Sequence, residues 1–172
     1  CVPDYVQVES YVRASNVQAI VDGNQRVNRA LKAGGDAVGA TCVIHDLPGY
    51  LPMRDNPDMN QLLRSNSEPL FGPENVRQRV HMTASTDMGD VSHLMPVIHP
   101  WVGCIEGVLH SAEYNITVPD VAYIKTAQAL AMTIVDLLYD EAQVAEEILD
   151  KFEAPLTKET YIELLDSIAS GK

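Results

Sequence analysis

The chain begins with an alternating pattern of apolar and polar residues. Between Asp4 and Ala14, one set of alternate positions is mostly valine and the other is polar or charged: Val6, Val8, Ser10 and Val12 against Gln7, Glu9, Tyr11 and Arg13. Successive side chains of a β-strand point to opposite faces, so this pattern predicts a strand that is buried on one side.

Helical spacing follows this segment. Apolar residues recur three and four positions apart over residues 17–31, and Asn16 stands where a side chain can cap the first turn. Gly34-Gly35 predicts the end of this helix, because glycine adopts the left-handed conformation without penalty. A second strand is predicted over Thr41–Leu47. Strand, helix and strand together indicate half of a small α+β sandwich.

A stretch with two prolines separates this part from the rest of the chain. It covers residues 50–57, and we place a domain boundary near residue 54, which divides the chain into residues 1–53 and 54–172. Beyond the boundary we expect a short helix over Asp58–Asn66 and a loop over 67–79. Two short strands are expected further on, at Leu94–Ile98 and Trp101–Ile105.

The last third of the chain is expected to be helical. Thr117, Pro119 and Asp120 favour a helix start, because they supply a cap, an early proline and a carboxylate near free amides. The apolar stripe that follows contains Val121, Ile124, Leu130, Ile134 and Leu138, and it resumes at Val144, Ile148 and Phe152. Thr157 is then expected to cap a last amphipathic helix.

Composition narrows the classes of function. With 46% hydrophobic and 21% charged residues, the 172-residue chain can bury a core. Its net charge of -12 disfavours nucleic acid and anionic membranes as partners, since both require a basic surface. The longest strongly apolar stretch, Ala129–Val135, is far shorter than the roughly 20 residues that cross a bilayer. Three cysteines without paired spacing, and no visible signal peptide, favour the reducing cytoplasm.

Two segments carry side chains suited to chemistry. Ser85–His93 is a loop of small residues and carboxylates whose backbone amides could hold a substrate carboxylate or an oxyanion. His110 ends an apolar run just before the predicted helix, a position where scaffold elements can hold a metal ligand. Each segment also has a plainer interpretation, the loop as a solvated turn or helix cap and the histidine as a hydrogen-bonded structural residue. The residues alone do not decide between these interpretations. Two zinc ions need about five to seven ligands, more than these two segments identify.

Four segments, taken in order, resemble the dinuclear-zinc aminoacylase/carboxypeptidase family, most closely its aminobenzoyl-glutamate and indoleacetyl-amino-acid hydrolase branches. Residues 2–13 look like the lid-domain strand that ends in an arginine, and residues 49–57 look like the return from lid to catalytic domain. Ser-Thr-Asp-Met-Gly-Asp-Val-Ser at 85–92 looks like the family's small-residue loop. Leu-His-Ser-Ala-Glu at 109–113 looks like its last zinc-ligand element, with Ala112 in place of the usual proline.

The resemblance implies an α/β fold. Residues 1–53 would be the C-terminal half of a two-layer α+β lid or dimerisation domain, and residues 54–172 the C-terminal portion of a three-layer α/β zinc-hydrolase domain. It also implies a hydrolase that cleaves the amide bond of N-acyl amino acids or small peptides, with two zinc ions, or manganese or cobalt, in the complete enzyme. A homodimer through the lid is implied as well. The tail beyond residue 140 is longer than the resemblance leads us to expect.

The resemblance also assigns site residues. His110 is implied as a metal ligand, and no catalytic residue is expected in this chain, because the general base and the other ligands belong to the family's N-terminal half. The implied substrate-binding residues are Arg13, Ser85, Thr86, Asp87, Gly89 and Ser92. Arg13 could equally form a structural salt bridge with Glu9. His93 and His99 match no family ligand and are interpreted as structural or surface residues.

We therefore expect an incomplete part of an amidohydrolase that is inactive alone. Two alternatives remain. One is a non-catalytic dimerisation module that uses the exposed strand at Asp4–Arg13, and the other is a carboxylate-binding module that uses the amides of the loop at 85–92.

Overall fold

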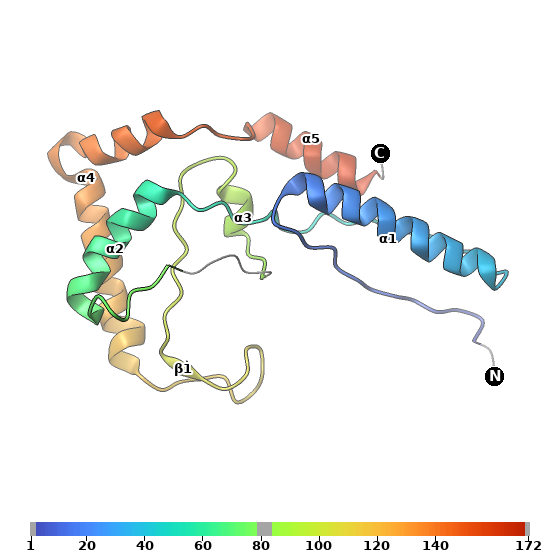
Figure 1. Cartoon of the computed structure of the whole chain (residues 1–172), viewed down its shortest axis with the longest axis horizontal. Helices are drawn as coiled ribbons and strands as arrows, with labels where there is room; N and C mark the ends of the chain where they lie inside the picture. The colour runs from blue at the N-terminus through green and yellow to red at the C-terminus, as the bar shows by residue number, and fades with distance from the viewer. Residues whose placement is uncertain (1–2, 79–83, 171–172) are drawn as a thin grey trace. The chain divides into compact units, whose positions relative to one another are not determined.

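The computed structural model describes residues 3–78 and 84–170 of the chain, and its elements are mostly helices (Figure 1). The described residues form two compact units. One contains residues 3–53, 84–90 and 156–170, and the other contains residues 54–78 and 91–155. With a small two-stranded sheet beside the helices, the fold is mixed and broadly α/β.

The first unit is built on helix α1, Val17–Ala37. The side chain of Asn16 accepts a hydrogen bond of 2.8 Å from the amide of Ala19, which confirms the predicted cap. Gly34-Gly35 does not end the helix, and that prediction was wrong. The left-handed residue that follows the helix is Gly39, with a φ of 72°. Gly35 instead allows the chain at Cys42 to approach the helix closely, because a Cβ on Gly35 would lie 3.0 Å from the Cβ of Cys42.

The two strands predicted in this unit are extended chain without a β-ladder. Val6, on the face expected to be buried, is 67% exposed. A strand needs a neighbour to receive its backbone hydrogen bonds, and the predicted half-sandwich lacks that neighbour within these residues. Both segments nevertheless meet α1, where a Cβ on Gly23 would lie 3.1 Å from Val12 and where Asn28 Nδ2 donates to Asp46 Oδ2 at 2.7 Å.

The second unit is built on the packing of two helices, α2 and α4. Helix α2, Pro57–Phe71, begins where Asn56 Oδ1 accepts from the amide of Met59 at 2.9 Å and ends at Gly72, with a φ of 84°. It therefore continues past the predicted end at Asn66. Helix α4, Thr126–Lys151, follows a π-helical turn, η1, at Asp120–Lys125.

A buried polar contact joins α2 to α4. Asn66 Nδ2 donates to Asp136 Oδ2 at 2.7 Å and to Thr133 Oγ1 at 3.3 Å, and Thr133 is 1% exposed. Thr133 Oγ1 in turn donates to the carbonyl of Ala129 at 2.8 Å. The donors and acceptors at this contact are thus paired, as buried polar groups generally are. Ile148, on the same helix, is also buried.

One predicted cap in the C-terminal helices differs in the structure, whereas an interruption and a second cap are found where they were expected. Thr117 does not cap η1, whose first turn has no side-chain cap; the Thr117 hydroxyl donates to the carbonyl of Cys104 at 3.4 Å. The interruption expected after Leu138 is present as non-helical backbone at Tyr139–Ala142, inside α4. Helix α5, Lys158–Ala169, begins at the predicted cap, with a capping box between Thr157 and Thr160.

The sheet is a short antiparallel hairpin. Strand β1, Ile105–Glu106, pairs with β2, Asn115–Ile116, so that Ile105 lies opposite Ile116. The strand predicted at Leu94–Ile98 does not form, and only the end of the predicted strand at 101–105 does. Helix α3, Met88–Val91, is a single turn within the candidate substrate loop.

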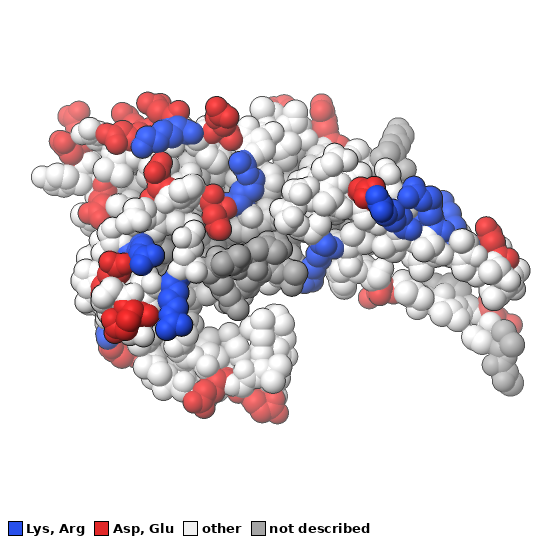
Figure 2. All heavy atoms as spheres, in the orientation of Figure 1, with Lys and Arg blue, Asp and Glu red and all other residues white. Residues whose placement is uncertain are grey.

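The helical stretch Asp120–Lys151, which includes the non-helical residues at 139–142, is more apolar than the sequence pattern predicted. By length and composition alone it could cross a membrane, since it has 32 residues and an 18-residue window of mean hydropathy 1.4. Core helices of soluble proteins meet the same criterion, so the absence of a membrane partner stays a prediction. On the face drawn in Figure 2, Asp and Glu side chains are scattered, with Lys and Arg between them.

Candidate functional site

The loop that starts at Ser85 folds into a capped helical turn. Thr86 Oγ1 donates to Asp87 Oδ1 at 3.1 Å, and the amide of Met88 donates to Thr86 Oγ1 at 3.4 Å. The amide of Gly89 donates to the carbonyl of Thr86 at 2.9 Å, which closes the turn into α3. Ser85 and Asp87 are exposed. The local geometry of this loop is therefore that of a helix cap. The outer end of the loop, at Ser85 and Asp87, is accessible to a ligand.

The inner end of the same loop holds the chain segment at residues 51–54. The amide of Leu51 donates to Asp90 Oδ1 at 2.9 Å, and the amide of Arg54 donates to Ser92 Oγ at 3.0 Å. Gly89 packs so closely that a Cβ at this position would overlap the carbonyl oxygen of Leu51. Leu51 and Ser92 are buried. Gly89 and Ser92 thus contact the protein itself, and this part of the loop is a structural anchor.

His110 lies in the hairpin between β1 and β2. It is exposed and adopts a left-handed backbone conformation, with a φ of 66°. Histidine is one of the residues enriched in that region among non-glycine types. The turn is held by the amide of Ser111, which donates to the carbonyl of Val108 at 3.0 Å. An exposed imidazole on a hydrogen-bonded turn is available to a ligand supplied from outside this hairpin.

Glu113 follows His110 in the same turn. A hydrogen bond from the Ser111 hydroxyl, and then one from its own amide, hold the pKa of the Glu113 carboxyl below its usual value. The carboxylate is therefore ionised at neutral pH. It is fully exposed.

Arg13, the remaining predicted substrate-binding residue, lies beside an aromatic side chain. Its guanidinium is 5.5 Å from the centroid of the Tyr11 ring, a cation–π distance, and both residues are exposed. Arg13 and loop residues 84–90 belong to one compact unit, whereas His110 belongs to the other. Within the described residues, no group of three or more His, Cys, Asp or Glu side chains could hold a metal ion.

Sequence reasoning assigned no role to two residues, Asp90 within the candidate loop and Tyr161 on α5. Asp90 was recognised only as a loop carboxylate, and Tyr161, on α5, was not singled out at all. The pKa of Tyr161 is raised, first by burial, then by the charge of Asp90 and by hydrogen bonding to it. A local pattern cannot reveal this pair, because the two residues are far apart in the sequence. His93 is buried, as its structural interpretation requires, and His99 is exposed beside Trp101.

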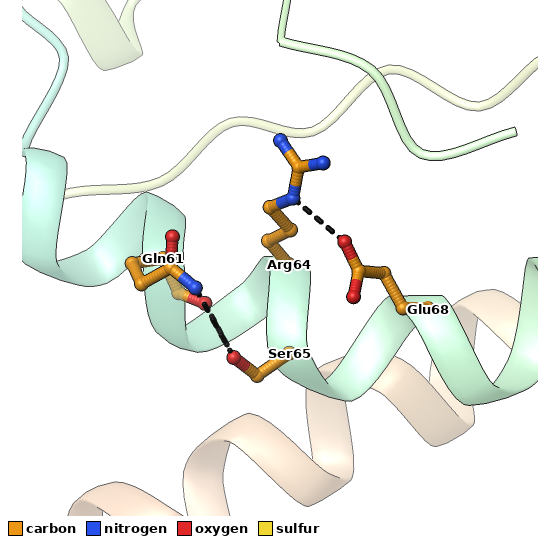
Figure 3. Close-up of polar contacts among 4 residues, drawn as sticks. All are labelled: Gln61, Arg64, Ser65 and Glu68. Carbon is orange, nitrogen blue, oxygen red and sulfur yellow. Dashed lines mark hydrogen bonds and ion pairs between the residues drawn. The ribbon is translucent and has the colours of Figure 1, made fainter. Parts of the chain in front are cut away.

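A separate open pocket of about 250 Å³ lies between α2 and the second half of α4. Its lining residues are Asp58, Gln61, Leu62, Ser65, Val144, Glu147, Ile148 and Lys151. Figure 3 shows the polar face of α2, where Gln61 Nε2 donates to Ser65 Oγ at 3.4 Å and Arg64 pairs with Glu68 at 2.7 Å. These contacts join residues four apart on one exposed helix face, so they support the helix. None of the predicted site residues lines this pocket.

Two known proteins are similar to the chain in sequence. It is 25% identical over 177 residues to the Xaa-Arg dipeptidase of Homo sapiens, and the alignment covers 96% of this chain and 39% of that protein. It is 26% identical over 171 residues to the Xaa-Arg dipeptidase of Mus musculus, covering 92% of this chain and 38% of that protein. No family model matches the chain, and no solved structure matches it.

The chain therefore spans about two fifths of the length of the curated relatives it matches. Both relatives are named as dipeptidases, and the aligned region includes most of the motifs described above. This similarity relates the chain to peptidases and amidohydrolases.

Proposed function

We propose that this chain is the C-terminal part of a metal-dependent amidohydrolase or peptidase that cleaves the amide bond of N-acyl amino acids or small peptides. The observation that carries the proposal is the similarity to two dipeptidases over at least 92% of this chain. The order of the four motifs supports it as well. Residues 1–53 would belong to the lid and residues 54–172 to the catalytic domain.

His110 is the residue that would hold a metal ion. Its imidazole suits zinc, manganese or cobalt, and its exposed position leaves it accessible to further ligands. One imidazole falls short of the three or four protein ligands that a zinc centre requires, so the other ligands would come from additional sequence. When bound, such a metal would polarise the substrate carbonyl and activate water.

The loop at 85–92 would bind substrate at its outer end. Ser85 and Asp87 are exposed there, and Thr86 orients the Asp87 carboxylate through its hydroxyl. Gly89 and Ser92 would contribute by fixing the loop against residues 51–54. Arg13 carries a permanent positive charge that suits a substrate carboxylate.

Two substrate classes differ in the charge of the released residue. The resemblance to the aminobenzoyl-glutamate branch favours an acidic amino acid, whereas the relatives' name, Xaa-Arg dipeptidase, indicates a basic one for those proteins. A substrate panel that pairs acyl-glutamates with Xaa-Arg dipeptides separates the two. A cytoplasmic location and a homodimer formed through the lid complete the proposal.

The test requires a longer protein that contains this chain. Its coding sequence should add His, Asp or Glu ligands, and the purified protein should hydrolyse members of the substrate panel in a chelator-sensitive way. His110→Ala should abolish hydrolysis, while His99→Ala, which alters an exposed histidine outside the motif, should leave it intact. Full activity in the His110→Ala protein would refute the assignment of this ligand.

A second function is favoured by the exposed N-terminal segment. Residues 5–12 belong to no β-ladder and expose Tyr5, Val6, Val8 and Tyr11, which suits pairing with another strand. If the chain is a dimerisation module, it should elute as a dimer, and proline at Val8 should convert it to a monomer. A monomeric wild-type chain would exclude this role.

A further inference from the structure

The first half of α4 is fixed to α2 along one side. Thr133 is 1% exposed, and the Asn66 side chain of α2 donates to its hydroxyl and to the carboxylate of Asp136. Ala129, one turn before Thr133, is 3% exposed. These α4 residues are three or four positions apart, so they share one face of the helix. The orientation of α4 about its own axis is therefore set by this contact.

The face of α4 that points away from this contact is apolar and exposed. At about 100° of rotation per residue, that face contains Ala127, Ala131, Ile134, Val135 and Leu138. The three larger side chains are 55%, 61% and 64% exposed in that order, and both alanines are exposed as well. Residues 126–135 include no charged side chain. We call these five residues the open face of α4.

An uncharged apolar face of this kind is typical of an interaction surface. A helix normally buries its apolar stripe against another element, and single exposed apolar residues, unlike a contiguous set, need no explanation. In the apolar 18-residue window of Asp120–Lys151, only 11% is buried. Because Ala127 and Ala131 have small side chains, a partner could approach the helix closely between the larger residues.

Two features favour a protein surface over a membrane as the partner. Helix α2, which packs against α4, carries the Arg64–Glu68 ion pair, with an N–O distance of 2.7 Å. A bilayer that enclosed α4 would also have to take up these charges, which is costly. The non-helical backbone at Tyr139–Ala142 is the second feature, because lipid tolerates such backbone only where protein or water surrounds it.

We propose that the open face of α4 is covered by the further sequence of the longer protein, through an apolar surface without charged groups. The chain spans about two fifths of the length of the curated relatives it matches, so most of a protein of their length lies outside it. The proposal rests on the proposed function in one respect, that this chain is part of a longer protein. It makes α4 the helix through which the two parts of that protein pack together.

The test is the rate at which a thiol on the open face is modified. Val135→Cys is introduced into the 172-residue chain and into the longer protein, and its reaction with N-ethylmaleimide is followed by peptide mass spectrometry. Modification should be at least about tenfold slower in the longer protein, because a covered thiol reacts only when the contact opens. Leu149→Cys is the matched control on the second half of α4, where Leu149 is 56% exposed, and it should react equally fast in both proteins.

Four results would overturn the proposal. One is equal modification of Val135→Cys in the two proteins, and another is equal slowing of Val135→Cys and Leu149→Cys in the longer protein. A third is slow modification of Val135→Cys in the 172-residue chain itself, which identifies a second copy if the rate depends on protein concentration and the chain's own residues if it does not. The fourth is co-sedimentation of the 172-residue chain with phosphatidylcholine vesicles that Val135→Glu abolishes, which identifies a membrane.

A polar replacement supplies a second measurement. Val135→Gln should leave the Tm of the 172-residue chain nearly unchanged, because the valine is already exposed, and should lower the Tm of the longer protein by several degrees. Leu149→Gln should change neither Tm by more than about 1 °C. A Tm of the longer protein that is unaffected by Val135→Gln would contradict burial of the open face.

Hydrolysis by the longer protein separates this proposal from the proposed function. If the longer protein hydrolyses no member of the substrate panel but protects Val135→Cys, the proposed function fails and the open face is covered as proposed. If the longer protein is active and Val135→Cys reacts as fast as in the 172-residue chain, the function stands and the proposal for α4 fails.

Discussion

Replacing Gly89 with alanine tests the closest contact in the candidate loop. A Cβ at this position would overlap the carbonyl oxygen of Leu51 and lie 3.0 Å from its carbonyl carbon. Both partners are backbone atoms, so no side-chain rotation can relieve the overlap. The loop and the segment at residues 51–54 would have to separate by about 1 Å, since non-bonded carbon and oxygen atoms stay about 3.3 Å or more apart.

The cost of that separation can be estimated from the contacts it breaks. The bond from the Leu51 amide to Asp90 is 2.9 Å long, and an extra 1 Å takes it beyond the range of about 3.2 Å for such bonds. A bond to a charged acceptor contributes about 1.5–3 kcal/mol, and overpacking alone costs about 1–3 kcal/mol. Gly89→Ala should therefore lower the free energy of unfolding by about 2.5–6 kcal/mol, which at about 2–4 °C per kcal/mol corresponds to a fall in Tm of at least about 5 °C.

The assay is thermal unfolding followed by circular dichroism, with Gly34→Ala as the matched control. A Cβ on Gly34 meets no atom within 4 Å, and alanine is favoured over glycine inside a helix by about 1 kcal/mol. The two Gly→Ala changes should thus shift Tm in opposite directions. An unchanged or raised Tm for Gly89→Ala would show that the loop does not pack against Leu51 as described.

Three further predictions concern other contacts. Gly35→Ala should lower Tm although Gly34→Ala raises it, because the new Cβ would lie only 3.0 Å from the Cβ of Cys42; equal shifts for the two would contradict the close approach. Asn66→Ala should cost about 1–2 kcal/mol in urea unfolding, since it removes the 2.7 Å bond to Asp136, and a change below about 0.5 kcal/mol would refute this. The pKa of Tyr161 is higher in the folded chain than its ordinary value, so its contribution to stability should be complete below about pH 10 and decline as pH rises through the folded pKa. Tyr161→Phe should remove that decline, which unfolding measurements between about pH 8 and pH 11 can detect.

The helices were the most predictable part of the fold. Asn16 and Thr157 were identified as caps from the sequence, and both make the expected hydrogen bonds. Capping depends on residues only two or three positions away, so a single sequence contains the necessary information. The helix end predicted at Gly34-Gly35 was wrong, because glycine also occurs where a neighbouring segment approaches closely. At Gly35 that segment is the chain at Cys42.

The strands and the loop contacts were less predictable. The alternation at residues 4–14 indicates a strand, but strand formation also depends on a partner that local pattern cannot supply. The influence of Asp90 on the pKa of Tyr161 depends on how separate segments fold together, so the local sequence around either residue cannot reveal it. The loop and His110 could be identified as candidate site residues from the sequence. The structure was needed to show that the outer end of the loop is accessible and that its inner end is anchored.

The central claim is that this chain contributes a single metal ligand, His110, to an enzyme completed by further sequence. It is tested most directly by the zinc stoichiometry and affinity of the 172-residue chain after gel filtration, measured by calorimetry beside His110→Ala. The account predicts weak binding, of the strength of one imidazole, that is lost in the variant. Tight binding of one or two zinc ions would contradict it, because the chain would then build a metal centre of its own.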